Sequence, residues 1–273
     1  MKNLKLVQLS RLFPSSWGRI CLTQKGTMQL AQTILVTSGK GGVGKSTVSV
    51  LLGAALAHGG KRVLLLEMDS GLRGMDIMLG VQDETVFDLS DVLTRRCEPI
   101  KAMAVCPYQP GLYLLPAPYD HCFIPDQGDL IRLTRGLAHH FDYLLVDTPA
   151  GLGRNFQAAA AVADRALLVA TPDPICVRDG RKVADTLEAL GVGNIRLVIN
   201  KVTPQLARMK MLPDLDAVID GVGVQLIGVV PQENQVMEAA AKGRPLPNSA
   251  VCRRVFANLA GRIEGKYIPL AIG

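Results

Sequence analysis

The residues with the clearest chemical meaning form the stretch TSGKGGVGKST, residues 37–47. Within it, GKGGVGKS (39–46) matches the phosphate-loop pattern G-x-x-x-x-G-K-[ST]. The glycines let the backbone curl so that N–H groups point at phosphate oxygens, and the positive end of the following helix adds to the attraction. We expect Lys45 to reach the β- and γ-phosphates, Ser46 to bind Mg²⁺ and Thr47 to contact the α-phosphate. The predicted nucleotide-binding residues of the loop are Gly39, Lys40, Gly41, Gly42, Val43, Gly44, Lys45, Ser46 and Thr47.

An alternation of strand and helix patterns must position this loop. The β-branched run TILVT (33–37) precedes it and an apolar helical pattern (46–58) follows it. Six more strand patterns and four more helical patterns continue the alternation. The strands are expected at 61–69, 111–117, 142–147, 166–172, 195–200 and 226–231, and the helices at about 127–140, 155–163, 177–190 and 233–242. This order predicts an α/β fold of the P-loop NTPase type, a mostly parallel twisted sheet with helices on both faces, in a single domain over residues 28–273.

The loop contains a second lysine, Lys40, which lies too early in the pattern to do the work of Lys45. An isolated lysine at this place would be a solvated surface residue. The whole stretch SGKGGVGKST, however, resembles the deviant Walker A motif of the MinD/ParA family of P-loop ATPases. In that family the early lysine crosses a dimer interface and contacts the phosphates bound by the other subunit. The resemblance therefore implies an ATP-bound homodimer that hydrolyses ATP with Mg²⁺, and a catalytic role for both lysines.

The segment EMDSGLRGMD (67–76) resembles switch I of the same family. The resemblance makes Asp69 the third catalytic residue, an acid that orients the attacking water near Mg²⁺. Glu67 stands where the family commonly has Asp, and it is one methylene longer. Arg73 and Asp76 match the motif, with a purely structural role as the alternative.

A further carboxylate, Asp147, ends the apolar strand pattern DYLLVD in the position of a Walker B acid. It could hold a Mg²⁺-bound water, because Mg²⁺ keeps much of its water shell. The stretch LLVDTPAGL (144–152) resembles switch II, in which Gly151 would sense the γ-phosphate. Gly153 stands where the family commonly has an acid. The expected metal-binding residues are Ser46, Asp69 and Asp147.

Two later segments resemble the parts of the family that recognise the adenine base. Asn200 ends the pattern IRLVIN, and PQENQVMEAAAKGRPL (231–246) resembles a segment that packs against the base. The candidate base contacts are Asn200, Pro231, Gln232 and Glu233, each of which in isolation would be an ordinary loop residue. With TPDPICVRDGRKVADTLEAL (171–190), the resemblance extends from residue 33 to about 260 and favours the MinD branch over the ParA and Mrp branches. The six cysteines contain no C-x-x-C pair, which argues against a metal cluster of the Mrp kind.

Charge gives little support to a nucleic-acid partner. The net charge is +6, but residues 1–27 contribute five basic and no acidic residues. The remainder holds 25 basic and 24 acidic residues, which is close to neutral. The basic extension itself is open to three interpretations: a disordered segment or a start assigned too early, an organelle-targeting segment, or a membrane-surface anchor.

The carboxyl-terminal stretch AVCRRVFANLAGRIEGKYIPLAIG (250–273) bears on membrane binding. Residues 250–264 are predicted to form a core-packed helix through Val251, Val255, Leu259 and Ile263. Only nine residues follow, too few for the usual basic amphipathic anchor of the MinD branch, so peripheral membrane contact is expected to be weak or indirect.

Four functions remain open on the sequence alone. The favoured one is a cytoplasmic switch ATPase that places the cell-division site with a division inhibitor of the MinC kind and an activator protein, with peripheral membrane contact as an addition. The alternatives are a regulator of flagellar or polar placement, a ParA-like DNA-partitioning ATPase, and a non-enzymatic nucleotide-binding adaptor. The adaptor is disfavoured because the complete set of Lys45, Ser46, Asp69 and Asp147 is present.

Overall fold

A computed structural model describes residues 30–70, 73–203 and 215–270, so the basic extension over residues 1–27 lies outside the described residues. It confirms the predicted α/β fold: eight strands form one sheet in the order β3-β4-β2-β5-β1-β6-β7-β8. All neighbouring pairs are parallel except β3 with β4. The strands are β1 Gln32–Thr37, β2 Val63–Glu67, β3 Ala104–Val105, β4 Leu112–Leu115, β5 Tyr143–Asp147, β6 Arg165–Ala170, β7 Ile195–Val202 and β8 Leu226–Pro231.

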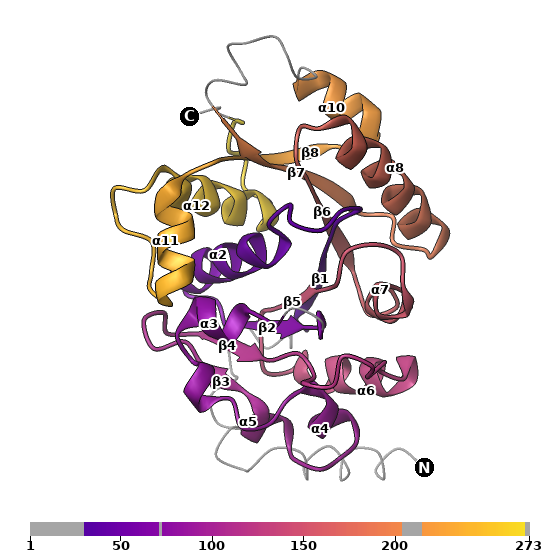
Figure 1. Cartoon of the computed structure of the whole chain (residues 1–273), viewed down its shortest axis with the longest axis vertical. Helices are drawn as coiled ribbons and strands as arrows, with labels where there is room; N and C mark the ends of the chain where they lie inside the picture. Colours follow the sequence, from indigo (N-terminus) through magenta and orange to yellow (C-terminus); the bar gives the residue numbers. More distant parts are fainter. Residues whose placement is uncertain (1–29, 71–72, 204–214, 271–273) are drawn as a thin grey trace.

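The helices cover the sheet on both faces (Figure 1). One side carries α2, α3, α11 and α12, and the other carries α6, α7, α8 and α10. The helices are α2 Lys45–His58, α3 Met75–Leu79, α4 Leu89–Leu93, α5 Pro99–Ala102, α6 Gln127–Leu137, α7 Arg154–Ala160, α8 Pro174–Ala189, α10 Leu215–Val222, α11 Asn234–Lys242 and α12 Val251–Ile263, with a 3-10 turn η1 at Gln82–Glu84.

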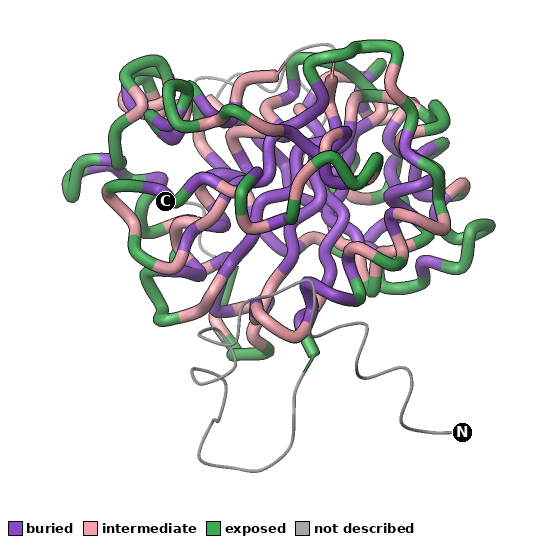
Figure 2. The backbone as a smooth tube through the Cα atoms, turned by 90° about the horizontal axis from the view of Figure 1, so that it is seen from below, coloured by how far each residue is buried: buried purple, intermediate pink, exposed green. Residues whose placement is uncertain are grey.

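The middle segments of the central strands are apolar because both faces of the sheet are covered. Residues 64–66, 144–146 and 167–169, from β2, β5 and β6, are at most 1% exposed. Figure 2 shows the buried residues gathered through the middle of the molecule, with exposed residues at the periphery. β1 lies between β5 and β6, so the chain leaves it toward β2 on one side and returns on the other. In open α/β sheets, ligands bind at the carboxyl ends of strands at such a switch point.

The patterns in the sequence did not predict the short elements β3, α3, α4 and α5, nor the helix α10. They also placed the end of β7 two residues too early. Five residues or fewer give no clear periodicity, which accounts for the short ones. Among the described residues, no helix is long and apolar enough to cross a membrane.

The predicted apolar face of the last helix is partly wrong. Leu259 and Ile263 are buried as expected, but Val251 is 41% exposed. Cys252 and Phe256 are fully buried, Val255 is half-buried against the core, and α12 packs against α2 and β8.

Replacing Phe256 by Ala should lower the free energy of unfolding by about 3–5 kcal/mol, because it empties a large buried site. Val251→Ala, on the exposed side of the same helix, should change it by about 0.5 kcal/mol or less. Urea unfolding followed by circular dichroism measures both variants. A larger loss for Val251→Ala than for Phe256→Ala would mean that the helix presents the face predicted from the sequence and not the face observed here.

Candidate functional site

The phosphate loop joins the carboxyl end of β1 to the start of α2 and is shaped by glycines with positive φ. Gly42 and Gly44 have φ of 76° and 92°, values that side chains disfavour. α2 begins at Lys45, directly after Gly44, which has no side chain to cap the first turn. The first N–H groups of α2 therefore remain available to an anion.

Two glycines of the loop are also required by close packing. A Cβ at Gly39 would lie 2.5 Å from the backbone of Asp179 in α8. A Cβ at Gly44 would lie 2.5 Å from Nδ2 of Asn200 in β7. The loop is thus held between α8 and β7, and the consensus glycines make that approach possible.

The structure brings Ser46 and Asp147, two of the three residues predicted to bind Mg²⁺, into direct contact. Ser46 Oγ donates to Asp147 Oδ2 at 2.7 Å, and Ser49 Oγ donates to Oδ1 at 3.0 Å. Asp147 is fully buried, and Lys45 is only 7% exposed. Burial raises the pKa of Asp147 to about 7, although the charge of Lys45 and the two serine hydroxyls oppose the rise.

Asp69 lies on the adjacent strand end. Glu67 pairs with Asp147 in the sheet register, and Met68 N–H donates to the Asp147 carbonyl at 2.8 Å. Asp69 follows directly and is half-buried. Within the described part of the chain, its carboxylate accepts no hydrogen bond and does not join the Ser46–Asp147 pair, so its catalytic role stays a prediction.

Glu67 has a structural function that the sequence left open. Its Oε1 accepts from the N–H groups of Gly74 and Met75 at 2.9 and 3.1 Å, and Oε2 accepts from Ala117 N–H at 3.2 Å. Burial raises the pKa of Glu67, and these three hydrogen bonds offset part of the rise. The side chain therefore ties the start of α3, in the switch I segment, to the chain that follows β4.

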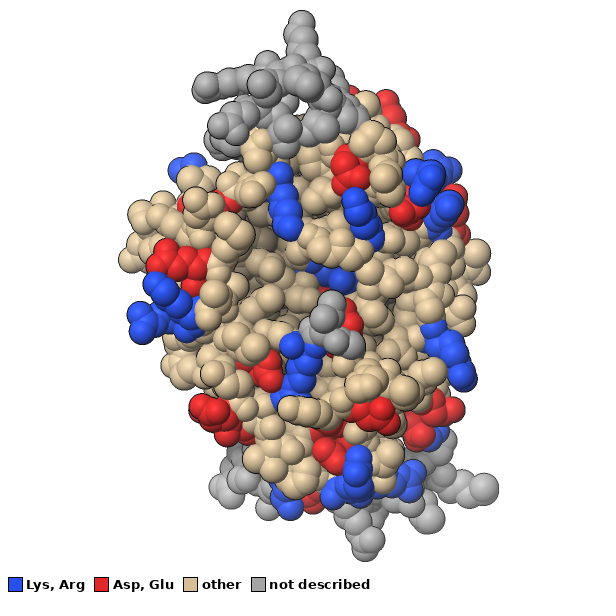
Figure 3. Space-filling view, viewed as in Figure 1, with Lys and Arg blue, Asp and Glu red and all other residues tan. Residues whose placement is uncertain are grey.

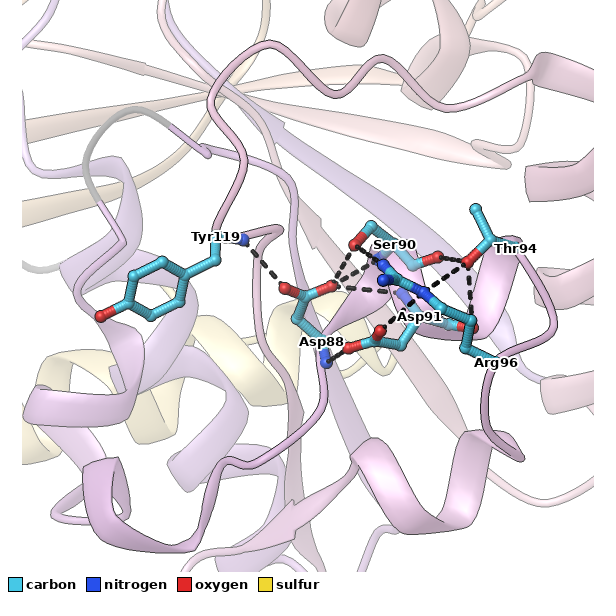
Figure 4. Close-up of polar contacts among 6 residues, drawn as sticks. All are labelled: Asp88, Ser90, Asp91, Thr94, Arg96 and Tyr119. Atoms are coloured by element: carbon cyan, nitrogen blue, oxygen red, sulfur yellow. Dashed lines mark hydrogen bonds and ion pairs between the residues drawn. The ribbon is translucent and has the colours of Figure 1, made fainter.

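Arg73 and Asp76 extend this tie toward α4. Arg73 Nε lies 2.8 Å from Asp76 Oδ2, and the guanidinium stacks 5.5 Å from the centre of the Tyr119 ring. Tyr119 N–H donates to Asp88 Oδ2 at 2.9 Å, and Asp88 caps α4 in a capping box with Asp91 (Figure 4). These contacts support the structural interpretation of Arg73 and Asp76.

Lys40 lies apart from the buried Lys45. Its Nζ is 3.6 Å from Asp173 Oδ1, and the two side chains are 45% and 34% exposed. Asp173 is the N-cap of α8, accepting from Cys176 N–H at 3.0 Å. Burial alone would raise the pKa of Asp173, but hydrogen bonds from Thr171 and Cys176, together with Lys40, lower it. Lys40 is thus held at the mouth of the loop by a pair that solvent reaches.

The candidate base contacts are brought to one edge but are already engaged in other bonds. Asn200 Nδ2 donates to Val43 O at 2.8 Å. Glu233 accepts from Val251 and Cys252 N–H at 3.1 and 2.9 Å and so caps α12. Gln232 is exposed, and Pro231 pairs with Val202 of β7. Their contact with a base remains a prediction.

A cavity of about 470 Å³ begins at Thr47 and continues along α2 beneath α11 and α12. Its walls are largely apolar and include Val50, Leu51, Val236 and Val251. Pro231, Gln232 and Glu233 are not among the residues that line it. The volume is that of a small-ligand pocket, and it adjoins the residue predicted at the α-phosphate.

Three residues at the site were not identified from the sequence: Ser49, Asp173 and Lys201. Ser49 follows Ser46 by three residues and so shares its helix face, a spacing that could have been noticed. Asp173 precedes Pro174 at the start of a helical pattern, which is a capping signal. Lys201, whose Nζ donates to Gly42 O at 2.6 Å, carries no such signal.

These features define a P-loop nucleotide-binding protein. Residues 34–246 match the family described as the CobQ/CobB/MinD/ParA nucleotide binding domain. The chain belongs to this family, in which the MinD/ParA proteins are P-loop ATPases.

Similarity to individual proteins indicates which branch of the family this chain resembles. The septum site-determining protein MinD of Synechocystis sp. is 38% identical over 86% of this chain and 90% of that protein. The MinC:MinD cell division protein complex of Aquifex aeolicus matches with a TM-score of 0.83 and 32% identity, covering 88% of this chain and 98% of that one. MinD of Pyrococcus horikoshii, solved with Mg-ADP, matches at 0.77 and 27%, covering 86% and 96%. These similarities confirm the expected resemblance to the MinD branch.

Replacing Ser49 by Ala should destabilise the nucleotide-free protein by about 1–3 kcal/mol at pH 8 and by less at pH 5. Above pH 7 the Asp147 carboxylate is charged and loses one of its two hydroxyl donors. The pKa of Asp147, raised to about 7, exceeds the ordinary Asp value, so the folded protein keeps a proton that the unfolded chain releases. Its contribution to the free energy of unfolding therefore falls as pH rises from about 4 to about 7.

Urea unfolding at the two pH values, without Mg²⁺, measures this effect. An Asp147→Asn background serves as the control, because there the cost of Ser49→Ala should not depend on pH. A cost in the wild-type background that is the same at pH 5 and pH 8 would contradict the assignment.

Proposed function

We propose that this chain is an ATPase that dimerises when ATP is bound and places the division site by recruiting a division inhibitor. The observation that carries the proposal is the separation of the two lysines. Lys45 is buried beside Asp147, whereas the Lys40 side chain is 45% exposed at the mouth of the loop. A lysine in that place can reach phosphates bound by a second subunit, as the family resemblance implies.

Within one subunit, hydrolysis would depend on positioning and on neutralising charge. Loop N–H groups and Lys45 would hold the phosphates. Ser46 and, through water, Asp147 fit Mg²⁺, because they supply hard oxygen donors that already face each other at 2.7 Å. When bound, Mg²⁺ would offset negative charge on the β- and γ-phosphate oxygens. Asp69, at the next strand end, would orient the attacking water.

Partners follow from the same comparison. The Aquifex aeolicus MinD is solved with MinC, which makes a MinC-like inhibitor the partner we propose here. An activator protein, and peripheral contact with the inner face of the cell membrane, complete the proposed cycle. On the face seen in Figure 3, acidic and basic side chains are interspersed and form no continuous basic field, which disfavours a DNA-partitioning role.

The Lys40→Ala variant should retain ATP binding but lose ATP-dependent dimerisation. The intact Lys45 and loop still bind the nucleotide, while the contact across the interface is removed. Size-exclusion chromatography with light scattering, with ATP on an Asp69→Ala background to slow hydrolysis, measures the mass. A Lys40→Ala dimer under these conditions would refute the role of Lys40. A parent Asp69→Ala protein that binds ATP and stays monomeric would refute the dimer itself.

Asp173→Asn should promote dimerisation, lowering the ATP concentration needed by up to about fivefold, because an exposed ion pair is worth at most about 1 kcal/mol. Asn retains the cap of α8, so the helix should be unaffected. The same chromatography across an ATP titration measures the shift. Arg181, on the same helix and paired with Asp185, offers a control, since Asp185→Asn breaks a pair that does not involve Lys40. A shift equal to that of Asp185→Asn would remove any specific function of the Lys40–Asp173 pair.

A further inference from the structure

The pairing of β7 with β8 contains an irregularity beside the phosphate loop. Ile199 pairs with Val229 and Val202 pairs with Pro231, so Asn200 and Lys201 together face one residue of β8. This is the arrangement of a β-bulge, which changes the direction of the side chains it contains. Lys201 also has φ of 58°, in the left-handed region that non-glycine residues rarely adopt.

The bulge lets two consecutive side chains reach the same loop. In a regular strand, neighbouring side chains point to opposite faces. Here Asn200 Nδ2 donates to Val43 O at 2.8 Å, and Lys201 Nζ donates to Gly42 O at 2.6 Å. Two adjacent carbonyls of the loop are therefore bonded by two adjacent residues of β7.

The planarity of the peptide bond turns these contacts into a constraint on the loop N–H groups. In a trans peptide the C=O and the following N–H point in opposite directions. Carbonyls of Gly42 and Val43 that point to β7 therefore direct the N–H groups of Val43 and Gly44 away from it. Successive N–H groups on one side of a turn form an anion-binding concavity.

We propose that Lys201 is a positioning residue for nucleotide binding: its ammonium fixes the Gly42–Val43 peptide so that the loop is preformed for phosphate. This inference rests on the nucleotide binding in the proposed function. Its prediction is specific, because a residue that shapes the loop should affect any ligand carrying a phosphate chain, with or without a base.

The test compares Lys201→Met, Lys201→Arg and Lys201→Gly with the wild-type full chain. Calorimetry gives the dissociation constant for Mg-ADP, and displacement of a fluorescent ADP analogue gives that for pyrophosphate. Lys201→Met, which keeps the chain length but not the charge, should weaken both ligands by roughly tenfold, since it removes one charged hydrogen bond. Lys201→Arg should restore most of the affinity. Lys242→Met, at an exposed lysine of α11 paired with Glu238, is the matched control and should change neither constant.

Four results would overturn the role proposed for Lys201. Wild-type affinity in Lys201→Gly, which keeps the left-handed backbone and removes the side chain, would overturn the proposal, as would unchanged affinity in Lys201→Met. Loss of ADP binding with unchanged pyrophosphate binding would assign Lys201 to the base or ribose and overturn it too. Urea unfolding of the nucleotide-free variants separates an effect on the loop from general destabilisation. A loss of affinity that is matched by an equal loss in the free energy of unfolding would mean general destabilisation and would overturn the proposal. A wild-type chain that binds no Mg-ADP would refute the proposed function itself.

Discussion

A buried carboxylate fixes the geometry of the whole site. Removing a carboxylate from water costs several kcal/mol unless hydrogen bonds and opposite charge compensate. Asp147 finds part of that compensation in the hydroxyls of Ser46 and Ser49 and in the charge of Lys45, and the uncompensated part raises its pKa. Because both serines lie on one face of α2, the helix cannot rotate or slide on β5 without breaking one of the two bonds. The start of α2, and with it the end of the phosphate loop, is thereby set.

The rest of the loop is held by β7 and α8, and switch I is held on the other side of the switch point. On one side, β7 bonds the carbonyls of Gly42 and Val43, and α8 packs on Gly39. On the other side, Glu67 ties switch I to the chain after β4. The loop is thus in contact with β7 and α8, and switch I is anchored separately by Glu67. A change in the loop on nucleotide binding would therefore reach β7 and α8 through direct contacts, whereas α3 is connected to the site through its packing on α2.

The sequence predicted those parts of the site whose chemistry permits few alternatives. A turn with positive φ needs glycine, and a buried strand that ends in Asp has few structural uses, so the loop and Asp147 were identifiable. Lys201 was not identifiable, because its direction depends on a bulge that exists only through pairing with β8.

The apolar face predicted for α12 was partly wrong because of the spacing that the prediction assumed. A strict i, i+4 series advances about 40° too far at each step, so Val251 and Leu259 cannot share a narrow buried face. The mixed spacing of Cys252, Phe256, Leu259 and Ile263 follows the core instead, as their burial shows. The mixed spacing keeps its members on one narrow face of the helix, whereas the strict i, i+4 series drifts away from it.

The interaction free energy of the Lys40–Asp173 ion pair limits its effect on dimerisation. At 3.6 Å and with both side chains partly exposed, the pair contributes at most about 1 kcal/mol. That is too little to prevent a subunit from dimerising if phosphates of a second subunit offer Lys40 several charge-assisted bonds, each worth about 1.5–3 kcal/mol. The pair is also weaker than the roughly 2 kcal/mol of rotamer entropy in a lysine side chain, so it favours the position of Lys40 at the mouth of the loop without fixing it. In the proposed dimer, Asp173 therefore acts on the starting position of Lys40, and the nucleotide supplies the free energy that moves it.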